Sequence, residues 1–123
     1  MTSVLVVDDD PDVCDLVRYK LEQSGFDVRS AHDGDQAMRE VDAAVPDLVL
    51  LDVMMPGISG LEVLERWRAK GVNLPVILLT AKAQENDVER GFELGADDYV
   101  IKPFSPRELA RRVTAVLSRH QSA

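Results

Sequence analysis

Short runs of consecutive apolar residues recur along the chain, and longer stretches with helical spacing separate them. The runs are rich in Val, Leu and Ile and cover residues 4–7, 28–31, 48–51, 76–79 and 99–101. The run at 28–31 is the least apolar of the five. An unbroken apolar run of this length is typical of a strand buried on both faces. The pattern therefore predicts five interior strands.

The stretches between these runs place apolar residues on one side of a helix. Val13, Val17 and Leu21 follow this spacing in the first stretch, as Leu109 and Val113 do in the last. Five strands alternating with five helices imply parallel pairing through right-handed crossovers. We expect an α/β fold in which helices cover both faces of an open sheet, and at 123 residues a single domain over residues 1–123.

Local signals support the helix boundaries. Asp10 followed by Pro11 is typical of a helix start, and Ser105 with Pro106 repeats this arrangement before the last helix. Glycines 25, 71 and 95 are expected to end helices. The stretch 83–94 has few apolar residues among many charged ones, so we expect the fourth helix to be loosely held.

Composition narrows the function classes. With 46% hydrophobic residues, the chain has no apolar run near the ~20 residues of a membrane span, and no secretion signal begins it, so we expect a cytoplasmic protein without membrane contact. The net charge of −8 disfavours direct nucleic-acid binding. Cys14 has no cysteine partner and is expected to pack inside, whereas His32 and His120 are expected at the surface.

Polar residues follow the predicted strands. The first strand ends in Asp8 and Asp9, the third in Asp52 and the fourth in Thr80, while Lys102 follows the fifth. Because ligands bind at the carboxyl ends of strands in open parallel sheets, we expect these side chains to meet at one edge.

Three carboxylates at that edge would repel one another and raise at least one pKa unless a cation lay among them. Mg²⁺ suits a shallow site with few protein oxygen ligands and leaves room for phosphate oxygens. For the acidic triplet alone, a solvated loop is an equal alternative, and Asp10 is better explained as a helix cap.

Four segments make the whole chain resemble the receiver (CheY-like) domain family of bacterial two-component response regulators. They read VLVVDDD at 4–10, PDLVLLDVMMPGISG at 46–60, PVILLTA at 75–81 and GADDYVIKPFSPREL at 95–109. The last is most similar to OmpR/PhoB-type receivers, whose full-length members carry a winged-helix domain and regulate transcription. The resemblance implies a flavodoxin-like doubly wound parallel sheet of order 2-1-3-4-5.

The resemblance also implies a phosphoacceptor signalling domain rather than a separate enzyme. Asp52 would accept a phosphoryl group from a sensor histidine kinase in a phosphorelay, and Thr80 and Lys102 would contact the phosphoryl oxygens. Mg²⁺ would be bound by Asp9, by Asp52 and by the backbone carbonyl of Met54, with Asp8 acting through a metal-bound water. The peptide bond between Lys102 and Pro103 would be cis.

Signal output would follow from a switch in which Thr80 captures the phosphoryl group and the aromatic side chain of Tyr99 rotates inward. Met54 and Lys82 would flank the route of the attacking water and tune the phosphoryl lifetime.

The resemblance further suggests a phosphorylation-promoted homodimer through the fourth helix, fifth strand and fifth helix. A two-fold axis could pair acidic with basic residues of this face, namely Glu93, Asp97 and Asp98 with Arg107, Arg111 and Arg112. The alternative is that these charges are paired within one chain or solvated.

Three rival functions are less consistent with the residues. A haloacid-dehalogenase-like phosphatase needs Thr or Val where Asp12 stands, and a flavodoxin needs a phosphate loop where the chain reads DDDP. A phosphorylation-independent interaction module would retain the fold but lose acidic, threonine or lysine positions, and none is lost.

Overall fold

The computed structural model describes residues 1–81 and 85–121. Its strands are β1 (Ser3–Val7), β2 (Asp27–Ala31), β3 (Leu48–Asp52), β4 (Val76–Ala81) and β5 (Asp98–Lys102). The helices are α1 (Pro11–Gln23), α2 (Gly34–Ala43), α3 (Gly60–Ala69), α4 (Glu85–Glu93) and α5 (Pro106–Gln121). Within the described residues, no helix is both long and apolar enough to cross a bilayer.

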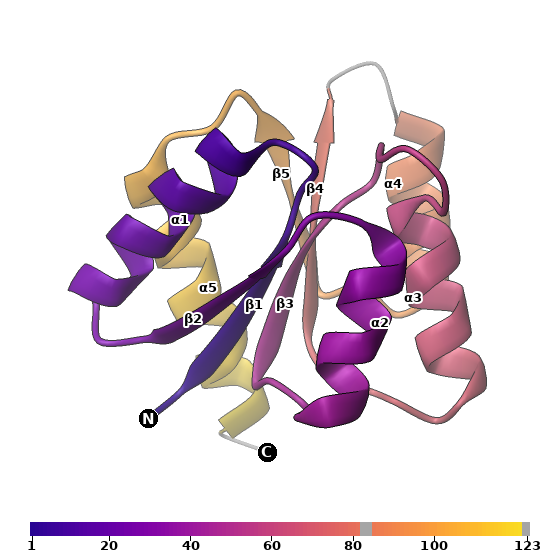
Figure 1. The fold of residues 1–123 in the computed structure, drawn as a ribbon, viewed down its shortest axis with the longest axis horizontal. Coiled ribbons are helices and arrows are strands. Elements are labelled where there is room, and N and C mark those ends of the chain that lie inside the picture. The colour runs from indigo at the N-terminus through magenta and orange to yellow at the C-terminus, as the bar shows by residue number, and fades with distance from the viewer. Residues whose placement is uncertain (82–84, 122–123) are drawn as a thin grey trace.

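The five strands form one parallel sheet in the order β2-β1-β3-β4-β5. This arrangement confirms the predicted flavodoxin-like fold. Helices α1 and α5 cover one face, and α2, α3 and α4 cover the other (Figure 1). The chain turns from one side of β1 to the other between β2 and β3, so the strand order reverses at the β1–β3 pair.

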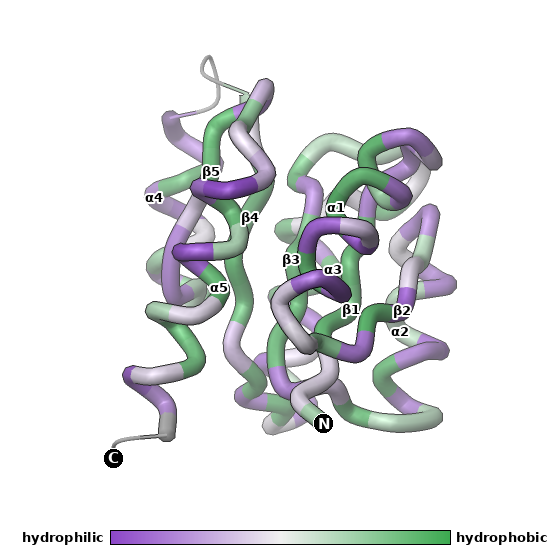
Figure 2. The backbone as a smooth tube through the Cα atoms, turned by 90° about the vertical axis from the view of Figure 1, so that its left-hand side faces the viewer, coloured by the Kyte–Doolittle hydropathy of each residue, from purple (hydrophilic) through white to green (hydrophobic). Residues whose placement is uncertain are grey.

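Alternate residues of each central strand enter two separate hydrophobic cores. Val4 and Val6 of β1 pack with α1 and α5, whereas Leu5 and Val7 pack under α2 and α3. Both faces of the strand therefore need apolar side chains, which explains the uninterrupted apolar runs in the sequence. Figure 2 shows β1, β3 and β4 as largely hydrophobic segments among helices of mixed character.

The predicted helix caps are present. The Asp10 side chain accepts a hydrogen bond from the backbone N–H of Asp12, and the Ser105 hydroxyl accepts one from Glu108. Glycines 25, 71 and 95 adopt positive φ after α1, α3 and α4. Each cap thus stops or starts a helix where the local sequence predicts.

Helix α4 is attached mainly through its C-terminal half. Gly91 is its only residue buried in the part of the chain that the structure describes, and it packs against the Leu78 side chain of β4. Arg90 forms an ion pair of 2.6 Å with Glu65 of α3. Just beyond the helix, the Arg68 guanidinium donates to the carbonyls of Leu94 and Gly95 at 3.0 and 3.1 Å. The predicted loose packing therefore applies to the N-terminal half.

Gly60 lets the start of α3 approach the end of β3 closely. Its N–H donates to the Val53 carbonyl at 2.9 Å, and a Cβ at this position would collide with the backbone carbonyl oxygen of Asp52. Because the obstacle is backbone rather than a flexible side chain, the collision can be relieved only by moving β3 or α3.

We expect Gly60→Ala to lower the free energy of unfolding by about 1–3 kcal/mol, the usual range for overpacking. Fluorescence of the single, buried tryptophan, Trp67, reports unfolding in a urea titration. Gly25→Ala is the control, because its Cβ would meet open space and only its φ of +91° is unfavourable. Both variants should lose stability, but only Gly60→Ala should shift the NMR signals of Asp52. Unchanged Asp52 signals in Gly60→Ala would contradict this account of the contact.

Candidate functional site

Strands β1, β3, β4 and β5 bring their polar ends to one edge of the sheet. Asp8 directly follows β1 and is fully buried, whereas its neighbour Asp9 is exposed. Asp52 and Thr80, at 4% and 1% exposure, lie at the ends of neighbouring strands. Parallel pairing places these residues side by side, as the sequence predicts.

Lys102 connects the acidic residues. Its Nζ lies 2.6 Å from Oδ2 of Asp8 and 3.3 Å from Oδ2 of Asp52. Asp8 Oδ1 accepts from the N–H of Asp10, and Asp52 Oδ1 accepts from the N–H of Met54 at 3.3 Å. One ammonium group from the edge strand thus contacts two carboxylates of interior strands. The Lys102–Pro103 bond that follows is cis.

The electrostatic balance of this cluster is unfavourable for Asp52. Burial, and then the charge of Asp8, raise the pKa of Asp52 to about 6 from 3.8, although Lys102 and the Met54 N–H act in the opposite direction. Burial alone would lower the pKa of Lys102, but the hydrogen bond to Asp8 and both carboxylate charges outweigh it, and the pKa is raised. Lys102 therefore stays charged, and one ammonium does not compensate the acidic cluster.

A divalent cation fits this arrangement. Asp8, Asp9 and Asp52 each offer an oxygen, and these three atoms lie within 4.8 Å of one another. Oδ2 of Asp8 is buried, and the Lys102 ammonium approaches it at 2.6 Å. All-oxygen, partly exposed ligand sets are those that Mg²⁺ prefers.

A hollow of about 350 Å³ adjoins the acid cluster on the side of α4. Thr80 and Tyr99 line it together with residues of α4, among them Glu85, Val88 and Glu89. The Thr80 hydroxyl donates to the Ala81 carbonyl at 3.3 Å, and the half-buried Tyr99 ring meets Phe92 edge to face at 5.9 Å. The two predicted switch residues therefore share one cavity.

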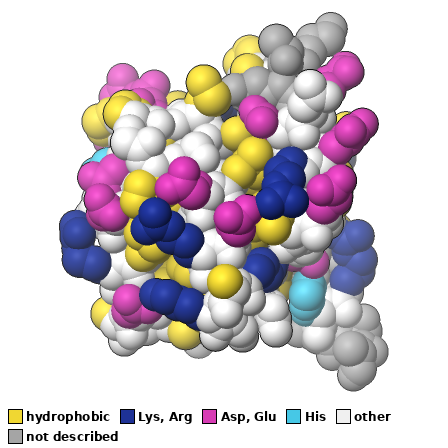
Figure 3. Space-filling model, turned by 90° about the vertical axis from the view of Figure 1, so that its right-hand side faces the viewer, with side chains coloured by type: hydrophobic (Ala, Val, Ile, Leu, Met, Phe, Trp, Pro, Cys, Tyr) yellow, Lys and Arg dark blue, Asp and Glu magenta, His cyan; other side chains and the backbone are white. Residues whose placement is uncertain are grey.

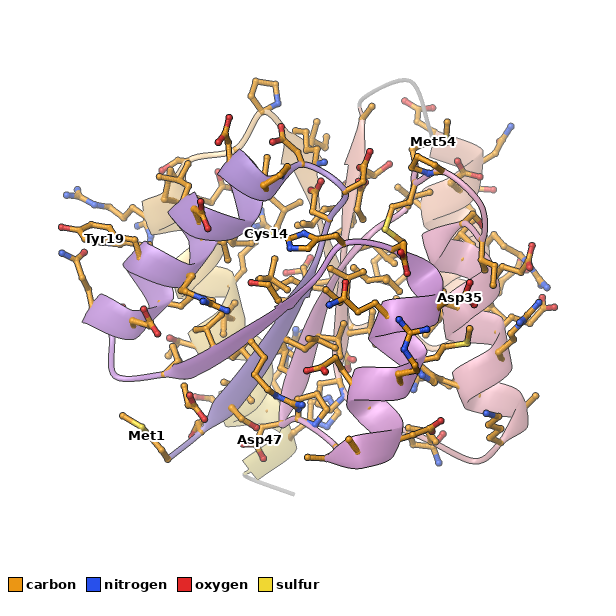
Figure 4. All side chains as sticks on the ribbon, viewed as in Figure 1. Met1, Cys14, Tyr19, Asp35, Asp47 and Met54 are labelled. Carbon is orange, nitrogen blue, oxygen red and sulfur yellow. The ribbon has the colours of Figure 1, made fainter. Side chains whose placement is uncertain are left out.

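Met54 lies at the same edge of the sheet and is 62% exposed (Figure 4). This exposure is compatible with a side chain beside the route of water. Lys82, the other residue expected to tune the phosphoryl lifetime, lies outside the described residues. The roles of both stay predictions.

The charged residues expected at a dimer interface are largely paired within the chain. Arg112 binds both carboxylate oxygens of Asp98 at 3.1 Å and Oε1 of Glu108 at 3.2 Å. Asp97 meets His120 at 2.7 Å, and Glu93 meets Arg90 at 3.5 Å.

Arg107 and Arg111 are exposed and form no ion pair with another described residue. On the face that carries α3 and α4, acidic and basic side chains are interspersed (Figure 3).

One contact was not anticipated from the sequence. Cys14 is buried as expected and His32 exposed as expected, yet Cys14 Sγ lies 3.8 Å from His32 Nδ1. Both atoms also approach the backbone carbonyl of Asp8, at 3.4 and 3.3 Å. Cys14 lies in α1 and His32 follows β2, and no periodic pattern in the sequence links the two positions.

Comparison with known proteins identifies the family. A family model described as the response regulator receiver domain matches residues 4–114. The chain belongs to this family. It is thus a receiver domain of a two-component response regulator, a signalling domain, and a phosphorylation-independent interaction module is not favoured.

Individual relatives agree with this assignment. The receiver is 48% identical over 121 residues to the alkaline phosphatase synthesis transcriptional regulatory protein PhoP of Bacillus subtilis, covering 98% of this chain but 50% of that protein. The chain therefore spans about half the length of this curated relative.

Solved structures extend the likeness to the fold. The receiver domain of the Francisella response regulator 1452 superposes with a TM-score of 0.90 at 37% identity, over 98% of this chain and 99% of that one. The chemotaxis protein CheY4 of Vibrio cholerae gives a TM-score of 0.88 at 30% identity, over 94% and 98%.

The raised pKa of Asp52 has a consequence for stability. Because the folded-state pKa lies above the unfolded value, ionisation of Asp52 destabilises the metal-free fold as pH rises from about 4 to about 6. We expect Asp52→Asn to be more stable than the parent at pH 7.5 by about 1–3 kcal/mol, at 1.36 kcal/mol per pKa unit.

Urea titrations at several pH values, without metal, measure this difference. The advantage of Asp52→Asn should shrink toward pH 4, and saturating Mg²⁺ should stabilise the parent more than the variant. Asp42→Asn, an exposed change on α2, is the control and should show neither effect. Equal stability of Asp52→Asn and the parent at every pH would contradict the repulsion described here.

Proposed function

We propose that Asp52 accepts a phosphoryl group from a sensor histidine kinase, in a Mg²⁺-dependent reaction, and that Thr80 and Tyr99 convert this event into a change of surface. The observation that carries the proposal is the sharing of Lys102 between Asp8 and Asp52 beside the exposed carboxylate of Asp9. This combination provides a nucleophile, a metal site and a fixed positive charge within one small volume.

Asp9, Asp52 and the Met54 carbonyl would hold the ion, and Asp8 would act through a metal-bound water. When bound, Mg²⁺ supplies positive charge to the oxygens of the phosphoryl group during transfer. The pKa of Asp52 is raised to about 6, but its carboxyl group remains largely ionised at neutral pH, so a carboxylate oxygen is available as nucleophile.

Besides compensating the charges of Asp8 and Asp52, Lys102 would act on the phosphoryl group. Its side chain is 28% exposed and its ammonium lies 3.3 Å from Asp52, within reach of a group attached to that carboxylate. Phosphoryl transfer is accelerated mainly by positioning and by charge stabilisation. Lys102 would therefore stabilise the phosphoryl oxygens, and the Thr80 hydroxyl would donate to one of them.

The switch follows from the cavity that Thr80 and Tyr99 share. Inward movement of Thr80 would vacate volume beside the aromatic ring, and the hollow of about 350 Å³ gives the ring space to enter. Phosphorylation can only bias conformations that already exist, by contacts that differ between them. The N-terminal half of α4, which lines the same hollow, would change position with the ring.

Acetyl phosphate with Mg²⁺ tests phosphorylation directly. Intact-protein mass spectrometry should show the gain of one phosphoryl group for the parent, none for Asp52→Asn, and none when EDTA removes the metal. Lys102→Ala should slow the reaction, because the phosphoryl oxygens lose a cation. Asp42→Asn should react like the parent. Equal labelling of Asp52→Asn would refute Asp52 as the acceptor.

We further propose that phosphorylation promotes a homodimer through α4, β5 and α5, and that the whole protein regulates transcription, as the name of the Bacillus relative suggests for that protein. Exposed Arg107 and Arg111 are available for acidic residues of a second copy. Arg112 would have to exchange its internal partners Asp98 and Glu108 for those of the other subunit. Such partly exposed pairs contribute little, so the exchange is energetically accessible.

Sedimentation velocity with and without beryllofluoride and Mg²⁺, a mimic of the phosphoryl group, tests the interface. The parent should dimerise only with the mimic, and Arg112→Glu should stay a monomer because it brings like charges together. Arg66→Glu on α3 is the matched charge reversal outside the proposed face and should dimerise like the parent. A dimer that is indifferent to Arg112→Glu would contradict this interface.

A further inference from the structure

Two side chains outside the acid cluster converge on the main chain at the end of β1. Cys14 reaches the Asp8 carbonyl from α1, and His32 reaches the same oxygen from the residue that follows β2. The distances to this oxygen are 3.4 Å from Sγ and 3.3 Å from Nδ1. The end of β1, helix α1 and the residue after β2 therefore meet at one peptide group.

The chemistry of these groups determines the direction of both hydrogen bonds. A carbonyl oxygen only accepts, so the thiol and the ring nitrogen are the donors. For His32 this requires the tautomer that carries its proton on Nδ1. Burial, and then the charge of Asp8, raise the pKa of the Cys14 thiol to about 11, which keeps the S–H intact at neutral pH.

The peptide group that they hold leads directly to Asp9. Because a peptide bond is planar, the direction of the Asp8 carbonyl fixes the plane that carries the N and Cα atoms of Asp9. The Asp8 side chain is held by Lys102 and by the Asp10 N–H. The Asp9 carboxylate, by contrast, is exposed and has no hydrogen-bond partner among residues 1–81 and 85–121, so its direction depends on the backbone.

We propose that Cys14 and His32 are positioning residues for the metal site, which orient the Asp8–Asp9 peptide so that the Asp9 carboxylate faces the ion. Neither residue touches the metal or the phosphoryl group. The inference rests on the magnesium site proposed above. Groups that orient metal ligands through hydrogen bonds commonly change metal affinity by 10–100-fold when they are removed.

Mn²⁺ binding, followed by electron paramagnetic resonance without any phosphodonor, tests this role. His32→Ala should weaken Mn²⁺ binding several-fold, and Cys14→Ala combined with His32→Ala should weaken it by about 10-fold or more. His32→Asn should recover most of the affinity, because its side-chain N–H₂ can replace the Nδ1 donor. Cys14→Ser should likewise retain a donor to the carbonyl.

Controls separate positioning from a general loss of structure. His120→Ala removes the other histidine, which contacts Asp97 rather than the acid cluster, and should bind Mn²⁺ like the parent. The free energy of unfolding of each metal-free variant is measured through Trp67. His32 is exposed, so the single variant remains informative even if loss of the buried Cys14 impairs folding.

Two results would overturn the inference: parent-like Mn²⁺ affinity in folded His32→Ala, or no recovery of affinity in His32→Asn. A parent protein that binds no Mn²⁺ would instead contradict the magnesium site itself, which distinguishes failure of the proposed function from failure of the positioning role.

Discussion

The carboxyl edge of the sheet depends on one ammonium group that two buried carboxylates share. A buried charge is costly unless an opposite charge compensates it, and Asp8 is completely buried. Lys102 provides this compensation from β5, and its side chain reaches both carboxylates although β4 separates β5 from β3 and β1. This pairing limits the repulsion between Asp8 and Asp52, which lie at the ends of the neighbouring strands β1 and β3.

The compensation is incomplete, and this incompleteness gives the site its chemistry. Two or three negative charges face one positive charge, so the pKa of Asp52 is raised and a divalent cation is favoured. A fully neutralised cluster would be more stable but would have no excess negative charge to attract a divalent cation. The receiver therefore accepts a local electrostatic penalty, which its two hydrophobic cores must offset.

The sequence predicted most of the fold because each of its signals is local. Strands buried on both faces leave unbroken apolar runs, and a cap such as Asp10 acts on its own helix. The expectation that the carboxyl ends of parallel strands meet at one edge of the sheet also placed Asp8, Asp52 and Thr80 together. It could not predict that Asp8 is fully buried while Asp9 is exposed, since adjacent residues at a strand end differ only in the direction of their side chains.

Contacts between particular side chains of different elements were beyond the reach of sequence patterns. The approach of Cys14 to His32 requires α1 and the end of β2 to meet at a particular angle. The pairing of Arg112 with Asp98 depends on the choice of side-chain conformation on a surface that offers several partners. Such choices are decided by small energy differences, and they leave no trace in hydrophobic periodicity.

The two halves of α4 differ in how firmly they are attached to the rest of the domain, so this helix can rotate about its C-terminal half. Its C-terminal half is fixed where Gly91 meets Leu78 and where Arg90 meets Glu65, whereas its first residues border the hollow beside Thr80. A rigid helix held at one end turns about that end, so a small rotation about the Gly91 contact displaces Glu85 the most. In the switch proposed above, the acid site would alter the molecular outline at α4 without rearranging either hydrophobic core.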